Sequence, residues 1–471
     1  MPTESILLVL TLVAGFYMAW NIGANDVANA MGTSVGSGAL TLKQAIFIAA
    51  ILEFSGSFFF GSHVSATLQS GIIKAEIFSD VPLQLVDGML AALLATGAWL
   101  QIASYYGWPV STTHAIVGSV IGFGAIVGGI DAIQWSNVGF IVSSWILSPI
   151  FGGIISYVIF TTLRRQILYT ENPVAKAKKL TPILVFIVLT ILSMILLFKG
   201  LQNLPGNLDF VQSIVICLAI GVTGAIISRF LVQRIKDIPV KAQEHPYHDE
   251  VYTGLEKAKK HLQQVQVTSR GQTQYQVSQL LEELDALSES LKPKQENRPM
   301  SQEYMVVEKI FGYLQILSAC LMAFAHGAND VANAIGPLSA AIDILNTGVV
   351  NVQPHVPTWA LGLGGVGIVI GLATWGWRVI LTIGKKITEL TPTRGFAAEF
   401  GAAFTILAAS RLGMPISTTH TLVGSVIGVG LARGIEALDL STMRDIVISW
   451  IVTIPISAAI TVAFFYLLQS F

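Results

Sequence analysis

The sequence carries little charge, because only 12% of its 471 residues are Asp, Glu, Lys or Arg. That share is about half of what a soluble globular protein usually contains. Two cysteines are too few for a disulfide framework. The opening residues, MPTESILLVL, lack the positive region and the small-residue cleavage site of a secretory signal. These features exclude a disordered chain, a nucleic-acid binder and an ordinary cytosolic enzyme.

Apolar residues are abundant instead: 53% of the chain is hydrophobic and the mean hydropathy is +0.67. A helix needs about 20 mostly apolar residues to cross the hydrocarbon core of a bilayer. Twelve stretches approach that length, at 6–30, 44–66, 85–106, 112–130, 138–162, 181–199, 211–234, 304–326, 359–384, 396–411, 415–432 and 445–469. We therefore expect an all-α polytopic protein embedded in the lipid bilayer, with about 12 transmembrane helices and some shorter pieces re-entrant.

The segment 235–303 differs from the rest, because 20 of its residues are charged. Val277, Leu281 and Leu284 recur at three- and four-residue steps, which is the spacing of one helix face. A second helix is expected over 252–267, with a turn at 269–271. The segment is predicted to be a solvated helical hairpin, with regulation or subunit contact as the alternative role.

The distribution of Lys and Arg predicts the orientation, since cytoplasmic loops are rich in both. If the N-terminus is outside, only Lys74, Lys199 and Arg411 fall in outer loops. The sequence therefore predicts a multi-pass cell-membrane protein with both termini outside and 235–303 in the cytoplasm.

Two motifs occur twice in the same order. GANDVANA at 23–30 is identical to 327–334, and PVSTTH at 109–114 closely matches PISTTH at 415–420. Seven expected spans precede the second copy, so the two halves enter the membrane from opposite sides. This is an inverted-topology repeat, in which secondary transporters place a substrate site between the halves. The expected divisions are 1–162, a linking pair of helices at 163–234, the hairpin at 235–303, and 304–471.

Four carboxylates stand within apolar spans, where burial costs several kcal/mol unless a partner compensates. They are Asp26, Glu53, Asp330 and Glu399. The first motif and its copy combine a carboxylate with amide oxygens and no imidazole or thiol cluster, which suits a hard cation such as sodium. The expected sodium ligands are Asn25, Asp26, Asn29, Asn329, Asp330 and Asn333. A purely structural polar clasp is the alternative.

The second motif supplies groups that bind anions. Pro109 and Pro415 favour a helix start, and the Ser and Thr residues that follow are cap residues. A helix N-terminus holds an oxyanion without a lysine. Because the anion would lie beside carboxylates, cations must neutralise the site, so cotransport follows from electrostatics. The expected anion ligands are Asp26, Asn29, Ser111, Thr112, Thr113, Asp330, Asn333, Ser417, Thr418 and Thr419.

Other polar residues are assigned less specific roles. His114, His326 and His420 are expected either to pack and form hydrogen bonds or to transfer protons. Arg378 and Arg411 lie near span ends and are expected to extend to the membrane interface rather than to bind substrate.

At these motifs the chain resembles the inorganic phosphate transporter family, and within it the sodium-dependent branch. The segment 311–337, FGYLQILSACLMAFAHGANDVANAIGP, is similar to the family's second signature. The resemblance implies sodium-driven symport of inorganic phosphate, a site built from both halves, no resident cofactor and a homodimer. It also makes Glu53 and Glu399 similar to membrane glutamates that family members need for transport.

Three alternatives remain open at this stage. The same fold could carry sulfate or use protons as the coupling ion, although a protonated phosphate can donate to a carboxylate and sulfate cannot. A membrane hydrolase could use Ser111 or Ser417 with the following histidine, but a single catalytic centre does not explain two copies on opposite faces. A sensor would need recognition features in 235–303, and none is evident.

Overall fold

The computed structural model describes residues 3–195, 197, 209–235, 248–268, 270–291, 302–351, 356–380, 390–434 and 438–470. Within these ranges the chain is helical apart from turns and connections, with one isolated antiparallel bridge between Ile73 and Ile133. Three features lie outside the described parts: the residue Lys199, the C-terminal end of the expected span 359–384, and the side chain of His63.

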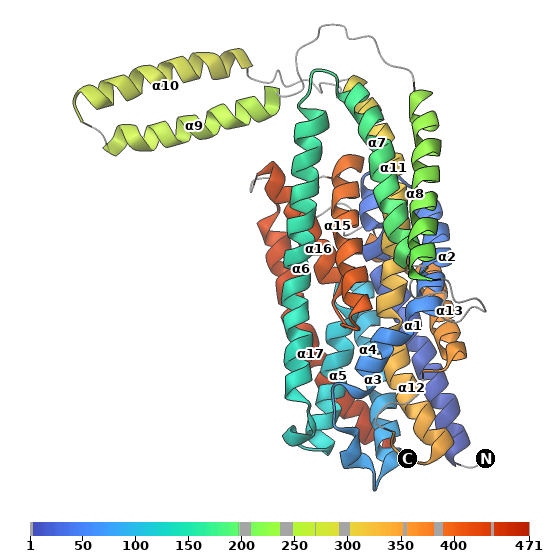
Figure 1. The fold of residues 1–471 in the computed structure, drawn as a ribbon. Helices are drawn as coiled ribbons and strands as arrows, with labels where there is room; N and C mark the ends of the chain where they lie inside the picture. Colours follow the sequence, from blue (N-terminus) through green and yellow to red (C-terminus); the bar gives the residue numbers. More distant parts are fainter. Residues whose placement is uncertain are drawn as a thin grey trace. The chain divides into compact units, whose positions relative to one another are not determined.

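The first half of the chain contains six α-helices (Figure 1). They are α1 (Thr3–Gly36), α2 (Leu42–Phe60), α3 (Ser62–Ser70), α4 (Pro82–Tyr106), α5 (Thr112–Val127) and α6 (Trp135–Leu163). Short turns η1 (Ala75–Phe78), η2 (Ile130–Ala132) and η3 (Arg164–Leu168) accompany them. The helices α7 (Pro173–Ile195) and α8 (Phe210–Gln233) then pack on each other.

The second half follows a similar order. It contains α11 (Gln302–Asp330), α12 (Ala332–Thr347), α13 (Thr358–Thr374), α15 (Pro392–Arg411), α16 (Thr418–Arg433) and α17 (Leu440–Leu468). The expected spans did not include α12, which continues the direction of α11 after a break at Val331.

Eight helices of the described chain are long and apolar enough to cross a membrane. They are Ser5–Gly36, Leu42–Phe60, Pro82–Tyr106, Trp135–Leu168, Pro173–Met194, Phe210–Gln233, Glu303–Thr347 and Ile446–Leu468. Helices α5 and α16 have 16 residues each. At 1.5 Å per residue they extend about 24 Å, which is shorter than the hydrocarbon core. Their lengths fit re-entrant pieces better than the full spans expected at 112–130 and 415–432.

The short helices α5 and α16 each pack against a long helix of the other half. Helix α5 packs against α17, and α16 packs against α6, so each short helix is covered by the last long helix of the other half. Glycines permit the close approach: a Cβ on Gly424 would lie 2.3 Å from the carbonyl oxygen of Pro149, and one on Gly118 would lie 2.7 Å from that of Ile454. Each short helix also packs on the preceding helix of its own half, α5 on α4 and α16 on α15, so both halves cover it.

Matching glycines also bring α1 and α11 close to their neighbours. A Cβ on Gly23 of α1 would lie 1.9 Å from the carbonyl oxygen of Ile368 in α13. At the repeated position in α11, a Cβ on Gly327 would lie 2.1 Å from the carbonyl oxygen of Glu53 in α2. The glycine that opens each GANDVANA motif is thus a point where two helix backbones touch.

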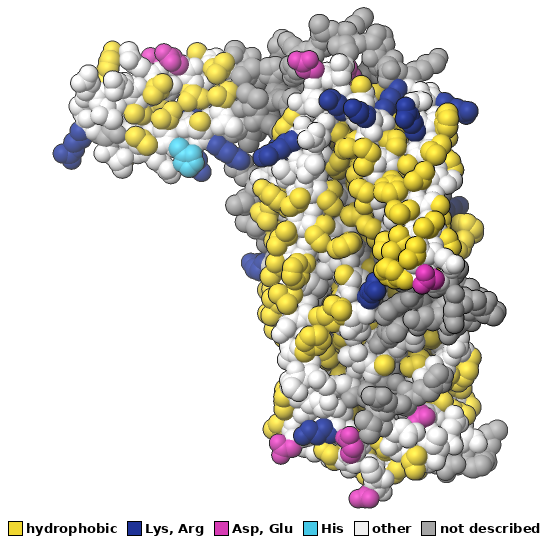
Figure 2. All heavy atoms as spheres, in the orientation of Figure 1, with side chains coloured by type: hydrophobic (Ala, Val, Ile, Leu, Met, Phe, Trp, Pro, Cys, Tyr) yellow, Lys and Arg dark blue, Asp and Glu magenta, His cyan; other side chains and the backbone are white. Residues whose placement is uncertain are grey.

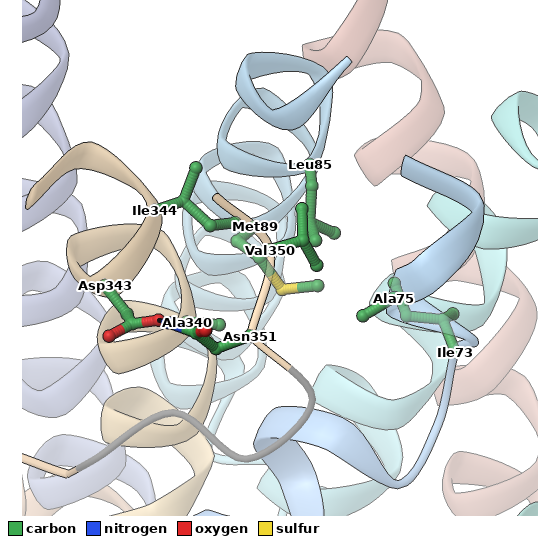
Figure 3. A pocket seen from close by; sticks show the side chains of 9 residues that line it. All are labelled: Ile73, Ala75, Leu85, Met89, Ala340, Asp343, Ile344, Val350 and Asn351. Atoms are coloured by element: carbon green, nitrogen blue, oxygen red, sulfur yellow. Dashed lines mark hydrogen bonds between the residues drawn. The ribbon is translucent and has the colours of Figure 1, made fainter. Parts of the chain in front are cut away.

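The outer surface of the helical unit suits a bilayer. Figure 2 shows hydrophobic side chains along its sides, with Lys and Arg side chains gathered at the end where α6 finishes and α7 begins. A small pocket lies between α4, η1 and the far end of α12 (Figure 3), where Asn351 Nδ2 donates to Asp343 Oδ2 at 2.7 Å. Asp343 is ten residues along α12 from Asn333, about 15 Å along the helix axis, so the pocket is separate from the repeated motifs.

Residues Ile235–Val307 form a second compact unit. Its helices α9 (His248–Thr268) and α10 (Gln272–Leu291) pack together and cover the two stretches expected to be helical. Val277 and Leu281 are buried on α10, and Lys259 pairs with Asp285 at 2.5 Å.

Candidate functional site

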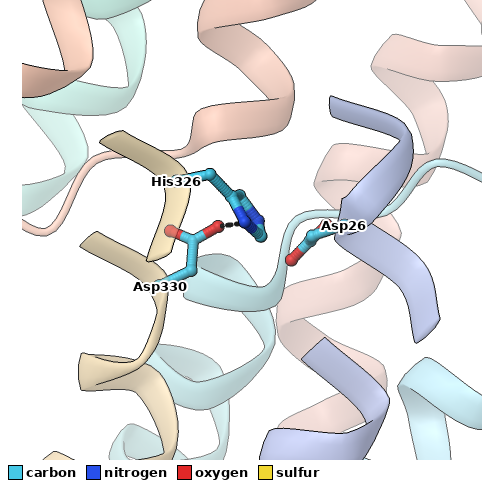
Figure 4. A group of neighbouring side chains, drawn as sticks. All are labelled: Asp26, His326 and Asp330. Atoms are coloured by element: carbon cyan, nitrogen blue, oxygen red, sulfur yellow. Dashed lines mark ion pairs between the residues drawn. The ribbon is translucent and has the colours of Figure 1, made fainter. Parts of the chain in front are cut away.

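The two GANDVANA motifs lie together in the interior. Asp26 is within α1, whereas Asp330 is the last residue of α11, and both side chains are completely buried. Ligand atoms of Asp26, Asp330 and His326 all lie within 4.8 Å of one another (Figure 4). The carboxylates that the repeat predicts on opposite-facing halves therefore share one cluster.

The asparagine before each aspartate makes the same contact in both halves. The amide of Asn25 hydrogen-bonds with the Ser104 hydroxyl at 3.0 Å, and the amide of Asn329 hydrogen-bonds with the Ser410 hydroxyl at 2.9 Å. Ser104 lies near the end of α4 and Ser410 near the end of α15. The sequence repeat is thus repeated in the contacts.

The chain turns sharply before each second motif. Gly107 follows α4 with φ 68° and Gly413 follows α15 with φ 69°, a left-handed conformation that glycine adopts without strain. Ser111 and Ser417 then cap α5 and α16, since each hydroxyl accepts a hydrogen bond of 3.2 Å from the backbone N–H three residues later. Both residues were expected to bind an anion directly; here they form the helix caps.

The N-termini of α5 and α16 meet. The Thr113 hydroxyl donates to the carbonyl of Ile416 at 3.0 Å, and the Thr419 hydroxyl contacts the carbonyl of Val110 at 3.4 Å. These are equivalent bonds in opposite directions. The free N–H groups of both helix starts therefore face the same interior region, where the partial positive charges of the two helix dipoles add.

Amide and hydroxyl groups join the motifs across the halves. Asn29 Nδ2 donates to Thr419 Oγ1 at 2.8 Å and to Asp26 Oδ1 at 3.1 Å. In the other direction Asn333 Nδ2 lies 3.3 Å from Oγ1 of both Thr112 and Thr113.

Within the second half, the Thr418 hydroxyl donates to Asp330 Oδ2 at 2.6 Å. Contacts between the two halves therefore connect the motifs, and one cluster contains Asp26, Asn29, Thr112, Thr113, Asp330, Asn333, Thr418 and Thr419.

Glu53 and His326 extend the cluster in a way that the sequence interpretation missed. His326 Nε2 lies 2.9 Å from Asp330 Oδ2, and His326 Nδ1 lies 3.4 Å from Glu53 Oε2. The expected ligand set did not include this imidazole, which lies just outside the repeated motif. His326 is one turn before Asp330 on α11, and that spacing was the available signal.

Glu399 occupies a different polar cluster. Its carboxylate accepts hydrogen bonds from Ser34 Oγ at 2.5 Å, Ser318 Oγ at 2.6 Å and Gln315 Nε2 at 3.3 Å, and also from Thr33. These donors lie on α1 and α11, so Glu399 joins α15 to both helices that carry GANDVANA. None of these four donors was predicted.

Four aromatic rings pack in a row behind the helix N-termini. The ring centroids of Trp145 and His114 are 3.9 Å apart, those of His114 and His420 are 4.2 Å apart, and those of His420 and Trp450 are 3.5 Å apart. His114 Nδ1 also lies 3.3 Å from the carbonyl oxygen of Trp450. The two histidines that follow the Ser-Thr-Thr runs thus pack at the contact between the halves.

The charge of the central cluster is its main chemical property. Asp26, Glu53 and Asp330 are completely buried beside a single imidazole, and one oxygen of Asp26 and both of Glu53 have no hydrogen-bond partner among the described residues. Carboxylate and amide oxygens are the ligands of hard cations. The cluster can therefore hold cations, and the neighbouring hydroxyls and N–H groups can hold an oxyanion.

A buried polar site built from both halves of a multi-pass helical membrane protein is typical of transporters. The phosphate transporter family matches residues 22–461, and the chain belongs to that family.

Known proteins agree with this assignment. The chain is similar to the chloroplastic inorganic phosphate transporter 2-1 of Arabidopsis thaliana, with 46% identity over 457 residues, 96% of this chain and 71% of the relative. A solved structure described as the sodium-dependent phosphate transporter matches with a TM-score of 0.79 and 36% identity, over 98% of this chain and 99% of that one. The resemblance seen in the sequence is confirmed, and the family and its relatives are transporters, not enzymes.

Proposed function

We propose that the protein is a secondary active transporter that carries inorganic phosphate together with sodium by alternating access. The observation that supports this most directly is the contact between the two motif types: Asn29 with Thr419, and Thr418 with Asp330. Cation ligands and anion ligands are joined in one buried cluster. An anion enters such a cluster only when cations offset the charge of Asp26, Glu53 and Asp330.

The architecture we propose is an inverted-topology repeat of 1–162 and 304–471, with 163–234 between them and about 12 membrane-spanning or re-entrant helical pieces. The equivalent contacts of Asn25 and Asn329 support it, as does the reciprocal packing of α5 and α16. Lys and Arg gather at the end of the helical unit between α6 and α7, which supports a cytoplasmic location for that end (Figure 2). The distribution of Lys and Arg along the sequence supports the same location for 235–303. Both termini are then outside the cell membrane, and the homodimer implied by the family resemblance is part of the same proposal.

The test of this function is uptake of labelled phosphate by purified protein in liposomes. An inward sodium gradient is expected to drive accumulation that dissipating the gradient abolishes, with no accumulation of labelled sulfate. Empty liposomes control for leakage. Sulfate accumulation without phosphate accumulation contradicts the substrate, and sodium-independent accumulation contradicts the coupling.

One observation favours proton coupling as a second candidate. His326 lies between Asp330 and Glu53, and an imidazole can donate from both nitrogens only when it is protonated. Proton binding at His326 would offset the buried carboxylates as a metal ion would. The same liposomes distinguish the two: phosphate accumulation driven by a pH gradient without sodium supports protons, and its absence supports sodium.

Removing the Thr418 hydroxyl tests the division of roles between the motifs. Replacing Thr418 or Thr112 by valine removes one hydrogen-bonding group beside the proposed anion position, worth about 1 kcal/mol, which is about a fivefold change in affinity. The apparent KM for phosphate is expected to rise by about that factor, and more than the KM for sodium. Thr461→Val is the control, because Thr461 is buried on α17 and bonds only its own helix. A larger change in the sodium constant would mean that the two motifs have exchanged roles.

A further inference from the structure

Arg378 sits in an aromatic cage. Its guanidinium carbon lies 5.2 Å from the ring centroid of Tyr105, 5.1 Å from that of Trp375 and 5.3 Å from that of Trp377. Tyr105 belongs to the end of α4, and the two tryptophans belong to the segment after α13. Cation–π contacts of this kind hold a guanidinium in place while leaving its N–H groups free to donate.

The cage does not neutralise the charge of Arg378. Among the described residues no carboxylate pairs with it, and its buried Nε has no hydrogen-bond partner. A guanidinium has five donors in a fork that matches the oxygens of a phosphate group. Arginine near the end of a span was expected to extend to the interface, but these contacts hold Arg378 against the protein.

The cage adjoins the residues on either side of Asp26. Ser104, which precedes the cage residue Tyr105, hydrogen-bonds with Asn25. Gly376, between the two cage tryptophans, packs so tightly on Val27 that a Cβ would lie 2.4 Å from its side chain. Asn25 and Val27 flank Asp26, so the cage is built on the same short stretch of α1 as the central cluster.

The neighbouring backbone is not helical and carries exposed aromatic side chains. Residues 108–111, between α4 and α5, are not helical. Non-helical backbone at membrane depth is tolerated only where protein buries it or where it lines a water-filled cavity. Tyr105, Tyr106 and Trp108 have exposed side chains. We call the exposed side chains of Tyr105, Tyr106 and Trp108 the mouth, and the chain runs from them to Ser111 and Thr112, which are buried.

We propose that Arg378 is a capture site for a phosphate oxyanion at this mouth, which holds inorganic phosphate before it reaches the Ser-Thr-Thr hydroxyls. The inference rests on the proposed transport of phosphate. A positive charge outside a cluster of carboxylates solves an electrostatic problem, because a free anion is otherwise repelled by Glu53, Asp26 and Asp330 before the bound cations can attract it.

The opposite half provides an arginine at the corresponding place. Position 411 follows Ser410 as position 105 follows Ser104, and it is Arg411. Ser410 contacts Asn329 as Ser104 contacts Asn25. In the first half, the guanidinium of Arg378 contacts Tyr105, which follows Ser104. In the second half, the residue that follows Ser410 is itself an arginine, Arg411. A cationic side chain therefore accompanies each of the two repeated asparagine contacts.

The experiment compares Arg378→Gln, Arg378→Lys and the control Arg229→Gln, which changes an exposed arginine on α8. Uptake is measured in liposomes of phosphatidylcholine alone and in liposomes that also contain phosphatidylglycerol. In both, Arg378→Gln is expected to raise the KM for phosphate about tenfold, the low end of electrostatic focusing effects, with the KM for sodium unchanged. Arg378→Lys should fall between wild type and Arg378→Gln, and Arg229→Gln should match wild type. Equal phosphate constants for Arg378→Gln and Arg229→Gln overturn the proposal.

The phosphodiester of a lipid headgroup is also an oxyanion. The two lipid compositions distinguish free phosphate from an anionic lipid, because choline offsets the phosphodiester charge in phosphatidylcholine and glycerol does not in phosphatidylglycerol. An effect of Arg378→Gln that requires phosphatidylglycerol means that the guanidinium binds lipid, which overturns the capture role.

Binding is also measured without transport, as the change in tryptophan fluorescence when detergent-solubilised protein is titrated with inorganic phosphate. Arg378→Gln should reduce the phosphate-dependent change and Arg229→Gln should not. If wild-type protein shows this binding but no sodium-driven uptake, the proposed function fails and the capture site stands. If Arg378→Gln leaves the fluorescence change intact, the capture site fails whatever the uptake shows.

Discussion

Replacing Asp330 by asparagine is expected to abolish the proposed sodium-driven phosphate uptake. The substitution keeps the size of the side chain but removes a buried negative charge that contacts both His326 and Thr418. Breaking a buried hydrogen-bonded charge contact costs about 3 kcal/mol, which corresponds to a loss of at least about a hundredfold. Initial rates of labelled phosphate uptake at saturating sodium measure the effect.

The equivalent change Asp26→Asn is expected to have the same outcome, because Asp26 contacts Asn29 and Thr419 in the same cluster. The matched control is Asp131→Asn, since Asp131 is an exposed aspartate of η2. Its uptake should equal that of wild type. Undiminished uptake by either buried variant, present in the membrane at normal amounts, would place the coupling ion elsewhere.

Replacing Gly327 by alanine is expected to prevent correct folding. The added Cβ would lie 2.1 Å from the carbonyl oxygen of Glu53, and that oxygen belongs to the backbone of α2 and cannot rotate away. Relief requires α11 and α2 to separate, which exposes buried side chains and displaces His326 from Glu53. The amount of monodisperse protein after detergent extraction measures the effect, and it should fall to a small fraction of the wild-type amount.

Gly312→Ala is the matched control, because Gly312 lies on the same helix and has open space where its Cβ would be. Alanine favours a helix by about 1 kcal/mol over glycine, so this variant should be extracted at least as well as wild type. A stable, monodisperse Gly327→Ala protein would show that the contact between α11 and α2 tolerates a shift.

The sequence predicted the membrane class and the placement of the two motif pairs well, because both are local signals. Apolar length identifies a helix in lipid, and an exact repeat identifies residues with equivalent surroundings. Asp26, Asp330, Thr419 and Asn333 were expected in one cluster on that basis, and the structure brings them together.

Other features depend on contacts between distant segments and left no local signal. The donors to Glu399 come from α1 and α11, and a serine or threonine in an apolar helix gives no sign of the carboxylate it faces. His326 is a partial exception: its position one turn before Asp330 was a local signal, but the repeat has Ile22 at the equivalent position and did not select it. Helix α12 was missed because its 16 residues, with Gly336 and Pro337 inside, are fewer than a separate membrane span needs.

The packing of each short helix on a long helix of the other half has a consequence for how the protein is made. During synthesis α5 leaves the ribosome long before α17, its cover, exists, and its glycine-lined face meets lipid or the insertion machinery until the last helix arrives. In the same way, α6 is synthesised before α16, the short helix that packs on it. Biogenesis therefore cannot be completed half by half, and in a nascent chain that stops before α17, helix α5 packs on α4 but the face that α17 would cover stays uncovered.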